Sequence, residues 1–130
     1  MEEIRSRREY RIEIVKFLYL VEAGGEYDKD EINEEVFKTT NEIIENNENI
    51  ERIISSSLTG YTLKRLNLVD VAILKLCVFE MLYKGLEPQI AINEALEITK
   101  MFSDIDGKQV KFNNAVLDKA KKLIIDERSK

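Results

Sequence analysis

Apolar residues recur along this chain at intervals of three and four, the spacing that places side chains on one face of an α-helix. The first such face is formed by Tyr10, Ile14, Phe17, Leu18 and Val21. This pattern predicts a helix over about 3–21. No stretch alternates apolar and polar residues with a period of two for long enough to suggest a strand. The pattern therefore predicts an all-α protein.

The same spacing predicts five more helices. The second is expected to start near Asp28 or Asp30, because either carboxylate could cap a first turn. The others are expected over about 50–58, 67–84, 89–102 and 108–126. The 67–84 segment is the most apolar and leaves little polar surface, so we expect it to be the central, buried helix. Gly85 and Pro88 separate it from the next helix, since glycine ends helices and proline suits a first turn.

The 130 residues are enough for one compact domain with its own core. The predicted connections are too short for separate linked domains. The simplest arrangement is two packed three-helix bundles within a single domain over 1–130. The two subdomains would cover about 1–60 and 61–130, joined through the segment 61–66.

Composition argues against catalysis and against metal binding. The chain has no histidine and a single cysteine, Cys77, in the middle of the most apolar helix. Histidine is the commonest general base and metal ligand, and a thiol in apolar surroundings is inert. No nucleophile motif and no glycine-rich phosphate loop is present. We therefore expect no enzyme, no catalytic residues, no bound metal and no cofactor.

The sequence also predicts a cytoplasmic protein that does not enter a membrane. There is no run of about 18 apolar residues, as a transmembrane helix would need. The N-terminus, MEEIRSRREYR, lacks the apolar centre of a signal peptide.

Charge is segregated along the chain, although the net charge is −5. Acidic residues crowd the stretch 22–51. Basic residues gather at Arg5, Arg7, Arg8 and Arg11, and again at Lys108, Lys111, Lys119, Lys121 and Lys122. A protein with its charge divided in this way can attract RNA at one end and a different partner elsewhere.

Two groups of residues are candidates for RNA contact. Arg7, Arg8 and Arg11 fall within about 100° of one another on a helix, and fork-shaped guanidinium groups suit phosphate recognition. Ordinary surface arginines paired with nearby acids would give the same spacing. Lys111, Phe112 and Asn114 combine a cation, an aromatic ring and an amide, a mixture that suits unstacked bases. Phe112 also fits the core stripe of its helix.

Four segments carry a family resemblance. They are RREYR followed by VKFLY, then LVDVAILKLCVFEMLY, PQIAINEALEITKMF and KFNNAVLDK. In order and spacing they resemble signature segments of the NusB family of bacterial transcription antitermination factors. The resemblance covers essentially the whole chain, is strongest over 63–119 and is weak over 24–57.

The resemblance implies a fold of two three-helix bundles and a specific function. NusB-like proteins bind the boxA element of single-stranded RNA together with a small-subunit ribosomal protein, NusE. The pair joins RNA polymerase with other Nus factors and supports rRNA transcription. The resemblance assigns RNA contact to Arg7, Arg8 and Arg11, with Lys111, Phe112 and Asn114 nearby. It places Glu80 and Tyr83 on the face that binds NusE.

The mechanism that we expect is a single basic surface formed by the first helix and the start of the last helix. The chain departs from the family at Glu9, where an arginine is frequent, at Asn113, where an apolar residue is usual, and in a longer loop over 103–110. The acidic excess and Glu9 favour an alternative, a helical protein–protein interaction module that has lost RNA binding. Asn93 and Glu94 are expected to be a structural polar pair that fixes the fifth helix against its neighbour.

Overall fold

The computed structural model describes residues 6–130, which form six α-helices, two short 3₁₀-helices and no strand within that range. The α-helices are α1 (Arg7–Glu22), α2 (Glu34–Glu45), α3 (Asn47–Ser57), α4 (Leu68–Tyr83), α5 (Pro88–Phe102) and α6 (Lys108–Arg128). The 3₁₀-helices are η1 (Lys29–Glu31) and η2 (Leu63–Arg65). The all-α prediction is confirmed. Arg5 and the predicted start of the first helix lie outside the described residues.

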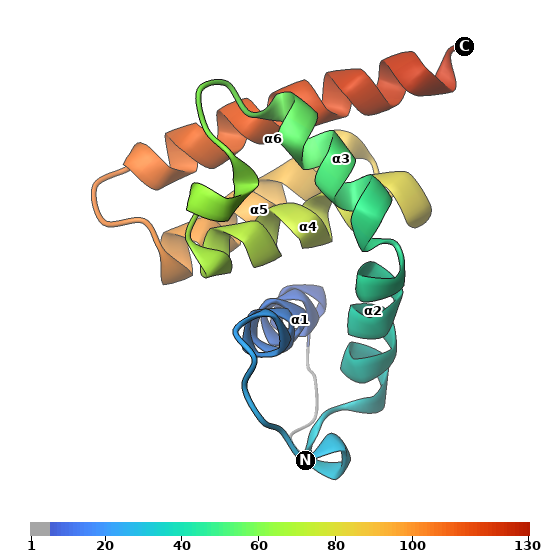
Figure 1. Cartoon of the computed structure of the whole chain (residues 1–130), viewed down its shortest axis with the longest axis vertical. Coiled ribbons are helices and arrows are strands. Elements are labelled where there is room, and N and C mark those ends of the chain that lie inside the picture. The colour runs from blue at the N-terminus through green and yellow to red at the C-terminus, as the bar shows by residue number, and fades with distance from the viewer. Residues whose placement is uncertain (1–5) are drawn as a thin grey trace.

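Helix α4 is the centre of the molecule, as its apolar sequence predicts. Every residue from Asp70 to Met81 is buried. Helices α1, α3, α5 and α6 all pack against it. In Figure 1, α1 and α2 lie on one side of α4, while α6 runs along the opposite side.

Helix α3 connects the two halves of the chain. Helix α1 packs against α2 and α4, whereas α3 packs chiefly against α6 and α4 (Figure 1). The buried apolar side chains of all six helices in residues 6–130 form one continuous cluster. The first three helices therefore share a core with the last three.

The start of α2 differs from the prediction. Asp28 caps only the single turn of η1, where its side chain accepts a hydrogen bond from the amide of Asp30. Ile32 is then extended, and α2 begins after Asn33, whose side chain accepts from the amides of Glu35 and Val36. Both Asp28 and Asn33 are good capping residues, so the sequence could not indicate which one precedes the longer helix.

The apolar surface of α4 is used for the core. Its thiol, on Cys77, is fully enclosed, and burial raises the pKa of that thiol well above its ordinary value. The predicted burial of Cys77 is therefore confirmed. No helix among residues 6–130 combines the length and the apolar character that crossing a bilayer would require.

Candidate nucleic-acid interface

The predicted RNA-binding arginines lie in the first two turns of α1. Ser6 starts this helix by accepting a hydrogen bond from the amide of Glu9 at 3.0 Å. Arg8 and Arg11 are three residues apart and share the face that meets α4 and α5. Arg7 points to a different side and lies over the ring of Tyr10, 4.9 Å from its centroid. These three arginines are called the α1 cluster below.

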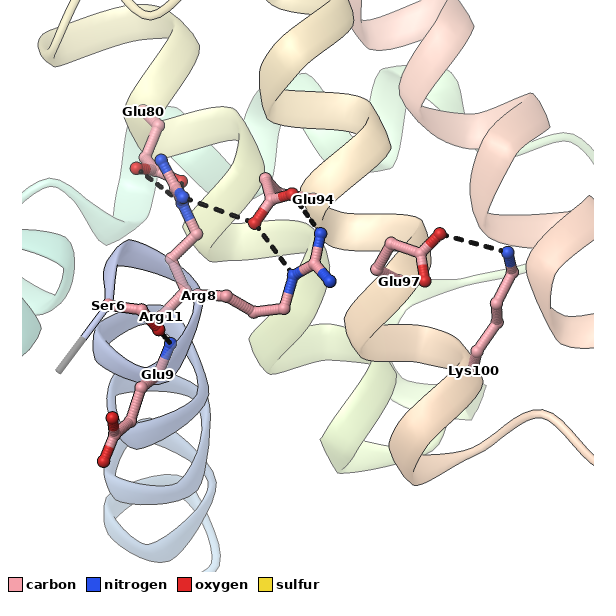
Figure 2. A network of polar contacts seen from close by, with 8 residues as sticks. All are labelled: Ser6, Arg8, Glu9, Arg11, Glu80, Glu94, Glu97 and Lys100. Atoms are coloured by element: carbon pink, nitrogen blue, oxygen red, sulfur yellow. Dashed lines mark hydrogen bonds and ion pairs between the residues drawn. The ribbon is translucent and has the colours of Figure 1, made fainter. Parts of the chain in front are cut away.

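Arg11 is buried, so its guanidinium is not on the exposed surface where the prediction expects an RNA contact. Its side chain is only 7% exposed. Its Nε donates to both carboxylate oxygens of Glu80, at 2.9 and 3.1 Å, and its Nη1 lies 3.6 Å from Glu94 (Figure 2). Helix α1 packs directly on α4, so the residue facing that contact is enclosed. Two carboxylates provide the charge that an enclosed guanidinium needs.

Arg8 lies at the edge of the same network and remains 48% exposed. Its Nε and Nη2 donate to the two oxygens of Glu94 at 3.1 and 2.7 Å, a bidentate pair (Figure 2). The hydrogen bond to Arg8 lowers the pKa of Glu94, and the same bond raises the pKa of Arg8. Both groups are therefore charged at neutral pH, and Glu94 fixes α5 against α1. The predicted structural role of Glu94 is confirmed. Asn93 is exposed, and among residues 6–130 its side chain bonds only to Gln89 of the same helix.

Arg7 is exposed and borders a cavity of about 310 Å³ between α1, α2 and α4. The other charged residues around this cavity carry both signs. Lys84 pairs with Glu42 there at 3.0 Å, and Lys38 lies nearby. The cavity therefore offers no uniformly positive surface.

The start of α6 carries the second group of candidates. Lys111 and Asn114 are exposed, and their side chains form no hydrogen bond or ion pair with any residue of the range 6–130. Phe112 is half-buried and meets the ring of Tyr61 edge to face, with centroids 5.3 Å apart. Tyr61 is itself 56% exposed. These four residues are called the α6 cluster.

The sequence did not identify Tyr61 as a candidate. It lies in the segment between α3 and α4, which the apolar pattern predicts only as a connection. The available signal was an aromatic residue in a short segment that also carries Lys64 and Arg65. Its proximity to Phe112 depends on how α6 folds back over the chain, and residue spacing contains no information about that.

The two clusters are anchored toward opposite ends of α4, so the single basic surface expected of the first and last helices would have to extend along α4. The α1 cluster is anchored at Glu80 through Arg11, near the end of α4. The α6 cluster is anchored at the beginning of α4, where Asn113 donates to Asp70 at 3.2 Å. Ten residues of helix, about 15 Å, separate these two anchor points.

The predicted partner-binding residues also face different ways. Glu80 is buried and turned toward Arg11 of α1, so it is not part of an open surface. Tyr83 is exposed, and its hydroxyl accepts a hydrogen bond from Asn49 of α3 at 3.0 Å. The i, i+3 spacing is correct, but each side chain packs against a different helix.

Comparison with known proteins places this fold and sequence in one family. Residues 8–122 match the NusB family. The transcription antitermination protein NusB of Clostridium botulinum is 47% identical over 77 residues, 58% of this chain and 56% of that protein. The NusB of Clostridium tetani is 40% identical over 97 residues, 73% of this chain and 62% of that protein. The matched regions thus span less than two thirds of the length of these relatives.

A solved structure has the same fold. NusB of T. maritima superposes with a TM-score of 0.74 at 26% identity, covering 92% of this chain and 93% of that one. The arrangement of helices is therefore similar over nearly the whole chain.

Proposed function

The chain belongs to the NusB family, and from this premise we propose that it acts in transcription antitermination as an RNA-binding protein of the cytoplasm. Its RNA is a boxA-like single strand, which it holds together with the ribosomal protein NusE. The complex then joins RNA polymerase with other Nus factors and supports rRNA transcription.

The observation that carries this proposal is the α6 cluster. Single-stranded RNA is recognised by aromatic rings on which bases stack, by cations that meet phosphates and by amides that meet base edges. Tyr61 and Phe112 supply the rings, Lys111 the cation and Asn114 the amide. Exposed side chains with no partner in residues 6–130 are open to a ligand.

The α1 cluster makes a smaller, electrostatic contribution. Arg7 and the exposed edge of Arg8 contact phosphates, while Arg11 holds α1 in place and does not touch RNA. A chain with a net charge of −5 has weak overall attraction for RNA. A basic ribosomal protein bound beside it adds positive surface, so NusE tightens the complex. We place the NusE contact around the exposed Tyr83, with Glu80 acting only through Arg11.

A titration tests the proposal. Binding of a boxA-like RNA is measured by fluorescence anisotropy, with and without NusE, at two salt concentrations. Replacement Tyr61→Ala removes an exposed ring and should weaken binding roughly fivefold or more, since one stacked base contributes about 1–3 kcal/mol. Tyr27→Ala is the matched control, because Tyr27 is also exposed and also meets a phenylalanine ring edge to face. Equal effects of the two replacements, or no tightening by NusE, would contradict the proposal.

A second candidate function is a helical protein–protein interaction module that does not bind RNA. The observation that favours it is the pairing of Arg8 and Arg11 with carboxylates, which leaves few free cations on α1. The same titration distinguishes the two. NusE binding without measurable RNA binding at low salt would support the module.

A further inference from the structure

We propose that Glu94 limits the affinity of the α1 cluster for RNA, because it occupies the guanidinium edge of Arg8 with which a phosphate would pair. This inference rests on the proposed RNA-binding function. It makes Glu94 an affinity-determining residue that acts through Arg8.

The geometry of the pair leads to this inference. Arg8 uses Nε and Nη2 together, at 3.1 and 2.7 Å, to hold both oxygens of Glu94. Two parallel bonds from one guanidinium edge are also the way in which arginine recognises phosphate. Both Nη1 protons and the second Nη2 proton remain free in this arrangement. A phosphate must therefore displace Glu94 to reach the Nε–Nη2 edge, or pair at the Nη1–Nη2 edge beside a carboxylate that repels it.

Displacement is feasible because the pair is at the surface. The Arg8 side chain is 48% exposed and that of Glu94 19% exposed, so water and RNA can reach both. The buried part of the network is held mainly by Glu80. Arg11 has its short contacts with Glu80, at 2.9 and 3.1 Å, and lies farther from Glu94, at 3.6 Å (Figure 2). Loss of the Glu94 charge therefore frees Arg8 and leaves Arg11 paired.

The chain supplies a matched control on the same helix. Glu97 lies one turn beyond Glu94 and pairs with Lys100 at 3.2 Å, so it does not bind Arg8 directly (Figure 2). Replacement Glu97→Gln removes the same unit of charge from α5. Any general gain from a less acidic surface should appear in both variants. Only Glu94→Gln releases the guanidinium group.

The test compares four variants with the wild-type chain for affinity to a boxA-like RNA. These are Glu94→Gln, Glu97→Gln, Arg8→Ala and the double variant Arg8→Ala with Glu94→Gln. We expect Glu94→Gln to bind roughly two- to fivefold more tightly than Glu97→Gln, in keeping with the modest strength of an exposed ion pair. Its salt dependence should steepen by about 0.7 in logarithmic slope, the contribution of one additional phosphate contact. In the Arg8→Ala background the Glu94 replacement should give no more than the general gain that Glu97→Gln shows.

The outcomes separate this inference from the proposed function. Equal or weaker binding by Glu94→Gln relative to Glu97→Gln overturns the inference. A gain larger than that of Glu97→Gln that persists in the Arg8→Ala background overturns it as well. Thermal unfolding of each variant shows whether a weaker binder is simply less folded. Absence of RNA binding by both the wild type and Glu94→Gln overturns the proposed function, and the inference with it.

Discussion

Asn113 is a fully buried amide near the start of α6, and its amide nitrogen donates to two neighbouring helices. Its Nδ2 donates to Asp70 of α4 at 3.2 Å and to Thr99 of α5 at 3.0 Å. Its Oδ1 accepts from Gln109 at 3.1 Å. A buried polar group is tolerated when it is bonded in this way, and the bonds then fix the position of α6. The same bonds therefore position the exposed Lys111 and Asn114, which lie beside Asn113 in α6.

Replacing Asn113 with alanine should therefore destabilise the fold. The change removes a donor from the buried carboxylate of Asp70 and leaves a small void, and we expect a loss of about 2 kcal/mol in the free energy of unfolding. Asn114→Ala is the control, because Asn114 is exposed and its side chain has no bonding partner in residues 6–130. Its effect should lie within about 0.5 kcal/mol of zero. Urea unfolding measures both, and equal losses would contradict the anchoring role.

The predictability of the site is limited by the distance in sequence between its parts. Helical spacing correctly places Arg8 and Arg11 on one face. It cannot indicate which carboxylates bind these arginines. Arg11 binds Glu80, 69 residues away, and Arg8 binds Glu94, 86 residues away. The role of Asn113 was easier to predict. A polar residue on the apolar face of a helix indicates either that the helical face is wrongly assigned or that the residue is buried in a hydrogen-bond network.

At the scale of elements, the helices were predictable because each has a clear apolar face. The positions of α4 and α5 agree with the expected ranges to within one residue at each end. Each helix begins after a capping residue, and a glycine or a serine follows its last turn. The segment between α1 and α2 was not predictable. It contains two capping residues, Asp28 and Asn33, and short 3₁₀-helices have no apolar periodicity of their own.

The two caps should differ in their contribution to stability. Asn33→Ala removes the side-chain acceptor for two amides of the twelve-residue helix α2, and we expect a loss of about 1 kcal/mol. Asp28→Ala affects one amide of a three-residue turn, so its loss should be less than half as large. Urea unfolding of both variants tests the comparison. A larger loss for Asp28→Ala would mean that η1, and not the Asn33 cap, holds the α1–α2 connection.

At the scale of the whole molecule, most cations are already paired with acids. Lys75 is buried between Glu22 and Glu51, each at 3.0 Å, which joins α1, α3 and α4. Arg52 pairs with Glu127 at 2.9 Å and thereby connects α3 to the end of α6. Charge in this chain thus serves largely to join helices. In the proposed function, the electrostatic attraction for RNA would depend on the cations that remain available, notably Arg7 in the α1 cluster and Lys111 in the α6 cluster.

Because those two cations lie at opposite ends of α4, their contributions to RNA binding should be independent. Arg7→Ala and Lys111→Ala should each weaken binding of a boxA-like RNA about fivefold, or about 1 kcal/mol, as expected for exposed charges. Each should also reduce the logarithmic salt slope by about 0.7, the contribution of one phosphate contact. In the double variant the two losses should add to within about 0.5 kcal/mol, since distant sites that share no partner do not interact.

The control for both replacements is Lys16→Ala. Lys16 is an exposed lysine of α1 whose only ion pair within residues 6–130 is a 3.6 Å contact with Glu13, so its removal changes the net charge equally. If Lys16→Ala weakens binding as much as the other two, RNA responds to net charge and not to the clusters. If each single variant loses little and the double variant loses more than the sum of the two, the RNA engages only one end of α4 at a time. Additive losses, with Lys16→Ala close to the wild type, require a single strand that reaches from the start of α1 to the start of α6.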